Sequence, residues 1–389
     1  MLKKMAVSRR GFIKVIGGTA ALAGVGAIGL SRCDRMPQDA VAAWGGPGPQ
    51  ESEARRRALS YALLAPNPHN RQPWIADLRE PDVITFLCDR TRLLPQTDPF
   101  ARQIVIGCGA FLELLRMAAA EQGLSADITY FPDGEWQEGQ VGDTPICRVV
   151  FTPDNNVARD PLFAHVLQRR TNRNPYSETA ITQEEATQLA SAIQSSPIQF
   201  GWAADAAKIA ELRLLAEQGW RVEVETDATY LESVRLYRIT GSEIADHRDG
   251  ISLHGPLIGW GKRLGLFTHE KALAIDASSR QQSFDFVANQ IRNTPSFAWL
   301  VTSGNDRLSQ LDVGTAYVRL NLKATELGLA IGPLSQVLQE FPAMLPLRVQ
   351  HKIILGVPET STVQMFARVG RADSMGPSPR RALDDVIRS

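Results

Sequence analysis

The sequence has no excess of charge of either sign, because its 42 basic and 42 acidic side chains cancel. A chain without net charge lacks the long-range attraction that draws proteins to polyanions or to anionic membrane surfaces. Nucleic acid is therefore not an expected partner. With 44% hydrophobic and 22% charged residues, the 389-residue chain has the composition of a globular protein, with roughly two domains or one two-lobed body.

Cysteine is also scarce, with four residues in the whole chain. Cys33 lies in the N-terminal segment, and Arg32 stands before it where a lipoprotein signal needs a small residue, so lipidation is not expected. Cys88, Cys108 and Cys147 have apolar neighbours, and three thiols cannot all pair with one another. We expect them to be buried, unreactive thiols.

No residues identify a catalytic class on their own. His247 and His254 lack a third ligand at a useful spacing, so we interpret them as loop residues and predict no metal site. No nucleophile, base and acid stand out as a triad either. The sequence therefore leaves the catalytic residues unassigned.

The N-terminus carries the most specific local pattern. Residues 8–14 read SRRGFIK, and a weakly apolar stretch rich in glycine and alanine follows to residue 30. This pattern resembles a twin-arginine signal, which exports folded proteins through the Tat translocase. An Ala-x-Ala site at 40–42 predicts a signal peptide over residues 1–42, and a Gly/Pro linker follows over 43–51. We expect a periplasmic protein, or one anchored to the outer face of the inner membrane if the signal is kept; export after folding favours a bound cofactor.

The rest of the chain predicts helices and strands in two series. Proline ends the first helix, and Gly123 ends a long second one as a left-handed cap. Asp160 and Pro161 predict the start of another helix. The predicted helices span 52–64, 102–122, 177–193, most of 205–247, and 311–329, and the predicted strands span 82–89, 145–153, 296–303 and 363–371. Two such series predict an α+β or α/β protein with a sheet in each half.

The two longest predicted helices share a pattern. A shift of 205 positions places Gly109 and Gly123 on Gly314 and Gly328, and it also superposes the apolar positions of one face. A duplicated unit would produce this match. Two unrelated amphipathic helices that end in glycine would produce part of it, so both explanations stay open.

The stretch LLAPNPHNRQPW, residues 63–74, places amide side chains directly after a helix end. Pro66 and Pro68 stiffen the backbone, and Asn70 and Gln72 offer donors and acceptors for a ribityl hydroxyl or a heteroaromatic edge. A rigid, solvent-facing helix stop is the alternative.

Two further segments concentrate arginine. RRTNRNPY, residues 169–176, holds three guanidinium groups and a threonine hydroxyl, and guanidinium groups match phosphate oxygens. The alternative is a solvated basic helix end. In the C-terminal segment, Arg368, Arg371, Arg380 and Arg381 lie on an extended, proline-stiffened run that could cross a neighbouring half or form a polar tail.

Together these motifs resemble those of the FMN-dependent nitroreductase family. APNPHNRQPW (65–74) resembles the family's ribityl-contacting loop, and RRTNRNPYS (169–177) resembles its N-terminal phosphate motif. ATELGLAIGPLSQ (324–336) resembles the helix and turn that approach the flavin ring, and SPRR (378–381) resembles the basic C-terminal clamp. The resemblance covers about residues 52–385.

The resemblance implies one FMN site per chain. It assigns the phosphate and pyrimidine edge to Arg169, Thr171 and Arg173, the ribityl and ring side to Pro66, Asn67, Asn70 and Gln72, the flavin face to Ile331 and Gly332, and the phosphate again to Arg380 and Arg381. Asn67 and Pro68 replace small hydroxyl residues of the commoner family pattern.

The order of the motifs departs from an ordinary family member, because the arginine-rich motif follows the Asn-x-Gln-Pro-Trp loop by about a hundred residues. The chain thus resembles the dimer-mimicking, Acg-like subfamily, which implies an α+β, nitroreductase-like fold of two fused half-domains and a pseudo-dimeric monomer. The implied halves are 52–155 and 156–389, the second with a lid at about 240–280 and a C-terminal arm.

Three functions stay open from the sequence. The first is an FMN oxidoreductase that transfers hydride to nitroaromatic or quinone-like acceptors, with NAD(P)H as a donor only where the protein meets the cytoplasm. The second is an FMN-sequestering protein with a closed lid. The third is a structural or interaction protein that has lost its flavin.

Overall fold

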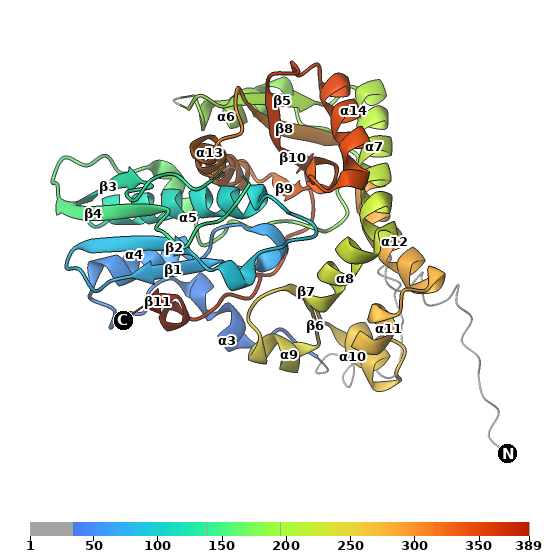
Figure 1. Ribbon diagram of the computed structural model, residues 1–389, viewed down its shortest axis with the longest axis horizontal. Coiled ribbons are helices and arrows are strands. Elements are labelled where there is room, and N and C mark those ends of the chain that lie inside the picture. Colours follow the sequence, from blue (N-terminus) through green and yellow to red (C-terminus); the bar gives the residue numbers. More distant parts are fainter. Residues whose placement is uncertain (1–33, 138, 195, 389) are drawn as a thin grey trace.

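The computed structural model describes residues 34–137, 139–194 and 196–388. Two β-sheets lie on either side of a pair of long crossing helices, α5 (Arg102–Ala120) and α13 (Arg307–Glu326) (Figure 1). One large apolar cluster joins α4 (Ala54–Ala62), both long helices and the inner faces of the two sheets. The two halves therefore share a core.

The first sheet has five strands in the order β11-β1-β2-β4-β3. Its strands are β1 (Trp74–Asp77), β2 (Val83–Cys88), β3 (Leu124–Tyr130), β4 (Cys147–Pro153) and β11 (Ile387–Arg388). All neighbours are antiparallel except β11, which pairs in parallel with β1 through Ala76 and Ile387. The C-terminal arm therefore returns to the first half, which the sequence had left open.

The second sheet has four antiparallel strands in the order β5-β8-β10-β9. These are β5 (Gln199–Ala203), β8 (Ser296–Thr302), β9 (Ala330–Pro333) and β10 (Thr362–Gly370). The other helices around it include α6 (Gln183–Ser191), α7 (Ala206–Glu225), α8 (Asp227–Arg235), α12 (Ala277–Arg292) and α14 (Leu345–Leu355).

Two boundaries differ from the sequence expectation. The segment that follows Asp160 and Pro161 is a short 3-10 helix (Pro161–His165), although Asp160 caps it as expected by accepting from Leu162 N. The helix expected over 311–329 begins earlier, because Asp306 caps it at Ser309 N. Cys88, Cys108 and Cys147 are buried, unpaired thiols, as predicted.

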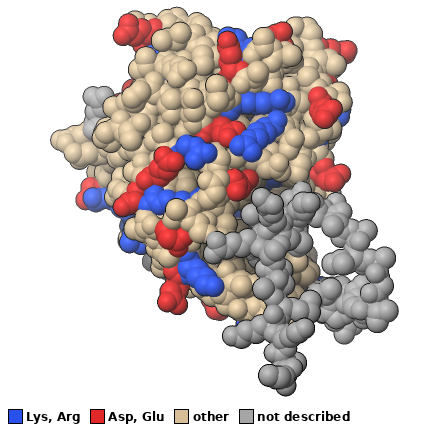
Figure 2. Space-filling model, turned by 90° about the vertical axis from the view of Figure 1, so that its right-hand side faces the viewer, with Lys and Arg blue, Asp and Glu red and all other residues tan. Residues whose placement is uncertain are grey.

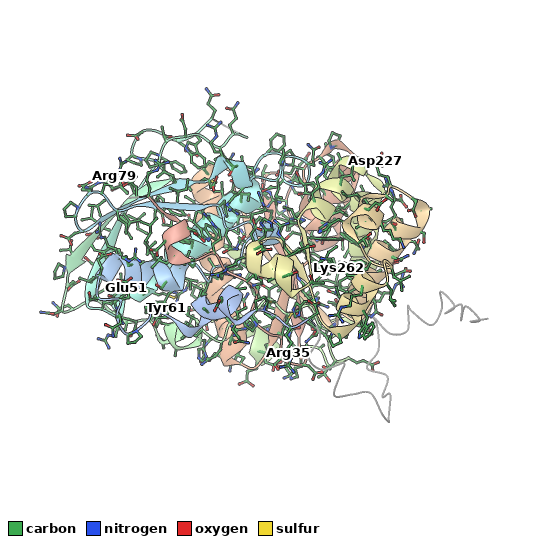
Figure 3. All side chains as sticks on the ribbon, turned by 90° about the horizontal axis from the view of Figure 1, so that it is seen from below. Arg35, Glu51, Tyr61, Arg79, Asp227 and Lys262 are labelled. Carbon is green, nitrogen blue, oxygen red and sulfur yellow. The ribbon has the colours of Figure 1, made fainter. Side chains whose placement is uncertain are left out.

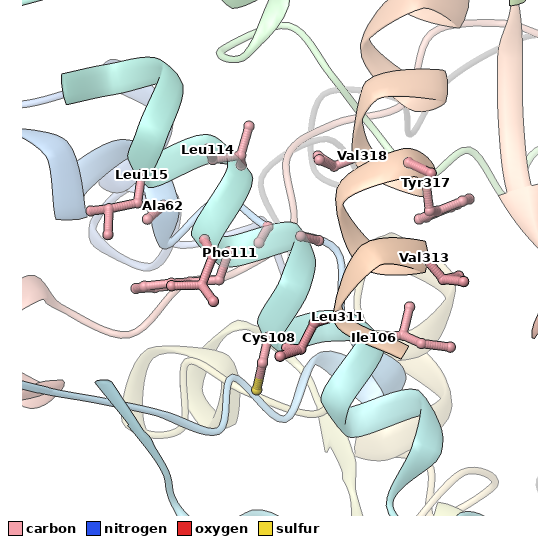
Figure 4. Packing of buried hydrophobic residues seen from close by; sticks show 14 of the residues in the cluster. Ala62, Ile106, Cys108, Phe111, Leu114, Leu115, Leu311, Val313, Tyr317 and Val318 are labelled. Carbon is pink, nitrogen blue, oxygen red and sulfur yellow. The ribbon is translucent and has the colours of Figure 1, made fainter. Parts of the chain in front are cut away.

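Helices α5 and α13 pack closely against each other (Figure 4), and their crossing depends on two glycines. A Cβ at Gly109 would lie 2.0 Å from the Leu311 carbonyl oxygen, and a Cβ at Gly314 would lie 2.0 Å from the Ile106 carbonyl oxygen. Both pairs are related by the shift of 205 positions, so each helix presents the same contact to the other. A two-fold axis between equivalent elements generates this reciprocal contact.

Helix α5 has the length and apolar composition of a membrane span, but 89% of its apolar 18-residue window is buried in the core.

Residues 34–45 are part of the folded body. Helix α3 (Gln38–Val41) and the 3-10 helix Ala42–Gly45 follow Asp34, and Ala40 and Trp44 are buried. The sequence pattern predicts the end of a signal peptide and a linker over this stretch, whereas the structure shows these residues packed in the fold. The twin-arginine motif itself lies outside the described residues.

The region predicted as a lid, residues 240–280, is called the cover below. It contains α9 (Gly241–Asp246), β7 (Ile251–Leu253), α10 (Pro256–Arg263) and α11 (His269–Leu273), and β7 pairs in parallel with β6 (Tyr237–Ile239). The Asp34 carboxylate accepts from Gly241 N and Gly255 N, which ties the N-terminal segment to the cover. Lys262 lies on this side of the molecule, away from Glu51, Tyr61 and Arg79 (Figure 3).

The outer face over α7 and α12 carries charges of both signs (Figure 2). Arg292 on α12 pairs with Glu217 on α7, and Arg280 pairs with Asp227 at the start of α8. This mixture agrees with the zero net charge of the chain.

Candidate functional site

Two arginines from distant parts of the chain meet inside the protein. Arg169 is 1% exposed and Arg380 is 3% exposed. Their Nη2 atoms donate to the same acceptor, the Leu64 carbonyl oxygen, at 2.7 and 3.1 Å. Within the described residues, neither guanidinium lies within ion-pair distance of a carboxylate. The site therefore holds two buried positive charges without a protein counter-ion.

Trp44 lies beneath this arginine cluster. Its ring centroid is 5.4 Å from the Cζ of Arg169, 4.1 Å from that of Arg170 and 5.0 Å from that of Arg380. The indole Nε1 donates to Ser378 O at 2.7 Å, so the C-terminal arm, which contains Ser378, also holds the Trp44 ring in place. Sequence patterns do not reveal Trp44 as a site residue, because it stands in a Gly/Pro-rich stretch that predicts a linker.

Several buried polar atoms of this site lack a hydrogen-bond partner among the described residues. They are Nε and Nη1 of Arg169, Nε of Arg380, the Tyr317 hydroxyl and both side-chain polar atoms of Asn321. Burial lowers the pKa of Arg169 to about 10 and the pKa of Arg380 well below its usual range, yet the pKa of Arg169 still leaves that guanidinium charged at neutral pH. Unpaired buried charge is costly unless an anion pairs with it. The donor set fits a phosphate group.

The arginine-rich segment lies beside β9. Asn172 N donates to Ile331 O at 3.0 Å, and Arg368 Nη2 donates to Asn172 O at 3.0 Å. A Cβ at Gly332 would lie 2.6 Å from Asn172 O, so this close approach requires glycine. The structure therefore brings the 169–173 segment together with Ile331 and Gly332, as the family resemblance implies.

Thr171 and Arg173 follow Arg169 in the segment that the resemblance assigns to the flavin, and Arg169 and Arg173 both act on the Tyr317 hydroxyl. The candidate flavin position beside Arg169, Arg380, Thr171 and Arg173 is called the recess below. The Arg173 side chain is exposed to solvent, and desolvation lowers its pKa. The Arg173 charge also lowers the pKa of Tyr317, against the larger effect of burial, which raises it. Thr171 is half-buried.

The loop over residues 66–72 forms the opposite wall, and its amides bind other parts of the chain. Asn67 Oδ1 accepts from Gln72 N at 2.8 Å. Gln72 is fully buried, with Oε1 accepting from Arg381 N and Nε2 donating to Arg248 O. Asn70 Oδ1 accepts from Arg380 Nη1 at 2.9 Å. The predicted ribityl residues thus hold the loop, the arm and the cover together.

Pro66 and Arg381 differ in their relation to the cluster. The Pro66 carbonyl lies against α5 at Gly107, close to Asn67. Arg381 donates to the carbonyl oxygens of Gln72 and Asp385 and borders an outer cleft of about 590 Å³. Arg381 therefore does not lie with Arg169 and Arg380, although the sequence grouped it with them.

One acidic residue of the cover, Asp249, binds it to the neighbouring loops through ion pairs. The Asp249 carboxylate accepts from Arg92 at 2.7 Å, from Arg238 at 2.7 Å and from Arg71 at 3.5 Å. Burial alone would raise the pKa of Asp249, but these guanidinium groups outweigh it and lower the pKa. Gly250 N also donates to Asn70 O at 3.2 Å.

Asp249→Ala should therefore loosen the cover. Removing one partner of a buried ion pair costs about 3–5 kcal/mol, and we expect the lower end of this range because Asp249 is 8% exposed. Urea unfolding should show the loss, and FMN, once bound, should dissociate faster. The exposed Asp227, which pairs with Arg280, provides the control Asp227→Ala, which should change neither quantity measurably. An unchanged flavin release rate in Asp249→Ala would exclude the cover as a barrier.

Comparisons with known proteins identify the family of this chain and several of its relatives. The model of the nitroreductase family matches residues 166–371, more than half of the chain, beginning three residues before Arg169. A Mycobacterium tuberculosis protein with the provisional name NAD(P)H nitroreductase acg is 27% identical over 354 residues, which cover 85% of this chain and 94% of that protein. The Serratia protein PigM, also provisionally named an NAD(P)H nitroreductase, is 25% identical and covers 86% of this chain and 93% of its own length.

Among solved structures, the FMN-dependent nitroreductase NfnB from Mycobacterium smegmatis, in complex with NADPH, superposes with a TM-score of 0.35 at 20% identity. The superposition covers 57% of this chain and 94% of the NfnB chain. The match of the family model, together with the mixed helices and sheets, confirms the predicted α+β nitroreductase fold. The chain belongs to the nitroreductase family.

Proposed function

We propose that the protein is an FMN-dependent oxidoreductase whose flavin site lies within one chain. The observation that carries this proposal is the buried pair of Arg169 and Arg380, which has unpartnered N–H groups and no carboxylate partner among the described residues. A dianionic phosphate would supply the missing counter-charge. Export by the Tat translocase and a pseudo-dimeric monomer remain part of this proposal.

The residues around the recess have different roles in this proposal. Arg169 and Arg380 would hold the phosphate, Thr171 and Arg173 the pyrimidine edge, and Ile331 and Gly332 one face of the ring. Pro66, Asn67, Asn70 and Gln72 would close the ribityl side, and Arg381 would hold this loop in place. The flavin itself supplies the hydride chemistry when bound. The protein binds it, orients it and limits access of water.

The proposed acceptors are nitroaromatic or quinone-like compounds. The names of the relatives suggest a nicotinamide donor, but NAD(P)H is confined to the cytoplasm. If the Tat signal operates, the exported protein needs a different donor, and its reduction by NADPH in vitro should be slow.

The test is an anaerobic visible spectrum of the purified protein, followed by NADPH and then dithionite. An oxidoreductase should be yellow. It should lose this colour slowly with NADPH and fully with dithionite, and it should regain the colour when a quinone is added. A protein that takes up no FMN would contradict the proposal and favour a structural or interaction role.

A second candidate is FMN sequestration. It is favoured by the cover, which Asp249 fixes through three arginines and which Asp34 ties to the N-terminal segment. In this case dithionite should bleach the protein, but NADPH and quinones should leave its spectrum unchanged.

A further inference from the structure

A buried carboxyl group is linked through hydrogen bonds to the loop over residues 66–72. Glu223 on α7 is 2% exposed, and no Lys or Arg among the described residues pairs with it. Its Oε2 accepts from Gln339 Nε2 at 2.8 Å, and its Oε1 lies 3.3 Å from Ser233 Oγ on α8. Burial raises the pKa of Glu223 to about 7, against the opposing bonds from Gln339 and Ser233. The carboxyl group is therefore partly protonated near neutral pH.

Ser233 connects this carboxyl group to the loop over residues 66–72. Its Oγ lies 3.1 Å from His69 Nε2. His69 has φ 48° and ψ 22°, a left-handed conformation that is disfavoured for a residue with a side chain. Asn70 and Gln72 also have positive φ values, 51° and 49°, so the loop is held in an unfavourable shape in which His69 reaches Ser233.

His69 contacts Ser233 and lies near enough to Arg173 for that charge to act on the imidazole. Desolvation lowers its pKa to about 4, and the charges of Arg173 and Arg71 add to this, so the imidazole is neutral at physiological pH. The ring is half-buried, and its Nδ1 has no hydrogen bond to another described residue. A neutral imidazole with one nitrogen bonded inward and the other free can pass on a proton.

We propose that Glu223, Ser233 and His69 form a proton relay that delivers one proton to the substrate in the recess. This inference rests on the proposed oxidoreductase function, which supplies the hydride. The other oxygen of Glu223 accepts a hydrogen bond from Gln339, whose amide does not titrate. The relay therefore stores a single proton and does not carry protons from the far surface.

The proton transfer balances without a further reactant. An acceptor that has received a hydride carries an anionic oxygen or nitrogen, which takes the proton from His69 Nδ1. Ser233 passes its hydroxyl proton to His69 Nε2, and Glu223 passes its carboxyl proton to Ser233. The relay ends with a Glu223 carboxylate and the other imidazole tautomer, and it reloads from water through His69 after the product leaves.

The charged and titratable groups around the relay lie on helix α8, on strand β6 and in two loops. Glu232 on α8 adds to the raised pKa of Glu223, Tyr237 on β6 faces it, and Arg71 and Arg173 face His69. No cation among them offsets the burial of Glu223.

The first experiment tests the stored proton without flavin. Because the pKa of Glu223 is raised in the folded state, its protonated form contributes stability that is fully present below the unfolded pKa, near 4.5, and is lost as the pH rises through about 7. The urea stability of the wild type relative to Glu223→Gln should therefore fall across this range. The exposed Glu225 on the same helix gives the control Glu225→Gln, whose curve should run parallel to the wild type. A constant difference between wild type and Glu223→Gln would overturn the proposal.

The second experiment uses the flavin-loaded protein and separates the half-reactions by stopped flow. In Glu223→Gln, reduction of the flavin by dithionite should be unchanged, whereas reoxidation by a quinone should slow by about 100-fold, the lower end of the usual effect of a positioned acid. Glu223→Asp should recover part of the rate. If flavin binds and turns over but Glu223→Gln reoxidises at the wild-type rate, the relay is wrong although the proposed function stands. If no flavin binds, the proposed function fails, and the urea experiment alone decides whether Glu223 stores a proton.

Discussion

Replacing Arg169 and Arg380 together with methionine should abolish retention of FMN during purification. Each guanidinium would make charge-assisted hydrogen bonds of about 1.5–3 kcal/mol to the phosphate. At about 1.4 kcal/mol per tenfold change, the double variant should bind FMN roughly 10²–10⁴-fold more weakly. Fluorescence titration with added FMN measures this loss directly.

The same double variant distinguishes a ligand site from a structural cluster. Both arginines are buried and lack a carboxylate partner among the described residues, so removing them also removes two costly desolvated charges. The flavin-free variant should therefore fold and melt close to the flavin-free wild type. Arg292→Met on the surface is the matched control for the change of residue type. Collapse of the flavin-free double variant, with Arg292→Met intact, would show that the cluster stabilises the fold and not a ligand.

Gly109→Ala and Gly314→Ala should both destabilise the protein strongly. Each new Cβ would lie 2.0 Å from a backbone carbonyl oxygen of the opposite helix, and neither backbone can move without shifting a core helix. Overpacking usually costs about 1–3 kcal/mol and occasionally more, so we expect at least the upper end. Denaturant unfolding monitored by circular dichroism measures the change.

The two substitutions should also cost similar amounts, because the two contacts are equivalent under the shift of 205 positions. Gly261→Ala in α10 is the control, since its Cβ would meet its nearest neighbour at an ordinary 3.4 Å. Alanine is the better helix former by about 1 kcal/mol, so this control should be neutral or stabilising. A large cost at one crossing glycine and none at the other would contradict the equivalence of the two contacts between α5 and α13.

Sequence patterns predicted the buried parts of the fold and missed the elements that depend on distant partners. The β-branched runs of β2, β4, β8 and β10 have buried faces that are visible in the sequence. Strand β3 is half-exposed, and β11 has two residues that pair only because the arm returns to β1. The register of such strands is set by tertiary contacts and leaves little local pattern.

The candidate site could be predicted only in part, because it too depends on contacts between distant parts of the chain. The arginine motifs could be found by residue type, but Arg380 and Arg381 were grouped, and the structure separates them because neighbouring side chains of an extended segment point to opposite sides. Trp44 and His69 gave no usable signal. Their roles depend on an aromatic contact with arginines far along the chain and on a left-handed loop conformation, and neither follows from local sequence.

The most direct test of the central claim compares the affinity of the purified protein for FMN and for riboflavin, which lacks the phosphate. Flavin fluorescence quenching, combined with the mass of the complex, gives both dissociation constants and the number of flavins per chain. We predict one flavin per monomer and FMN binding at least about 100-fold tighter than riboflavin, from two charge-assisted phosphate contacts. Equal affinities, or FMN binding only to a dimer of chains, would contradict a phosphate site formed by Arg169 and Arg380 within a single chain.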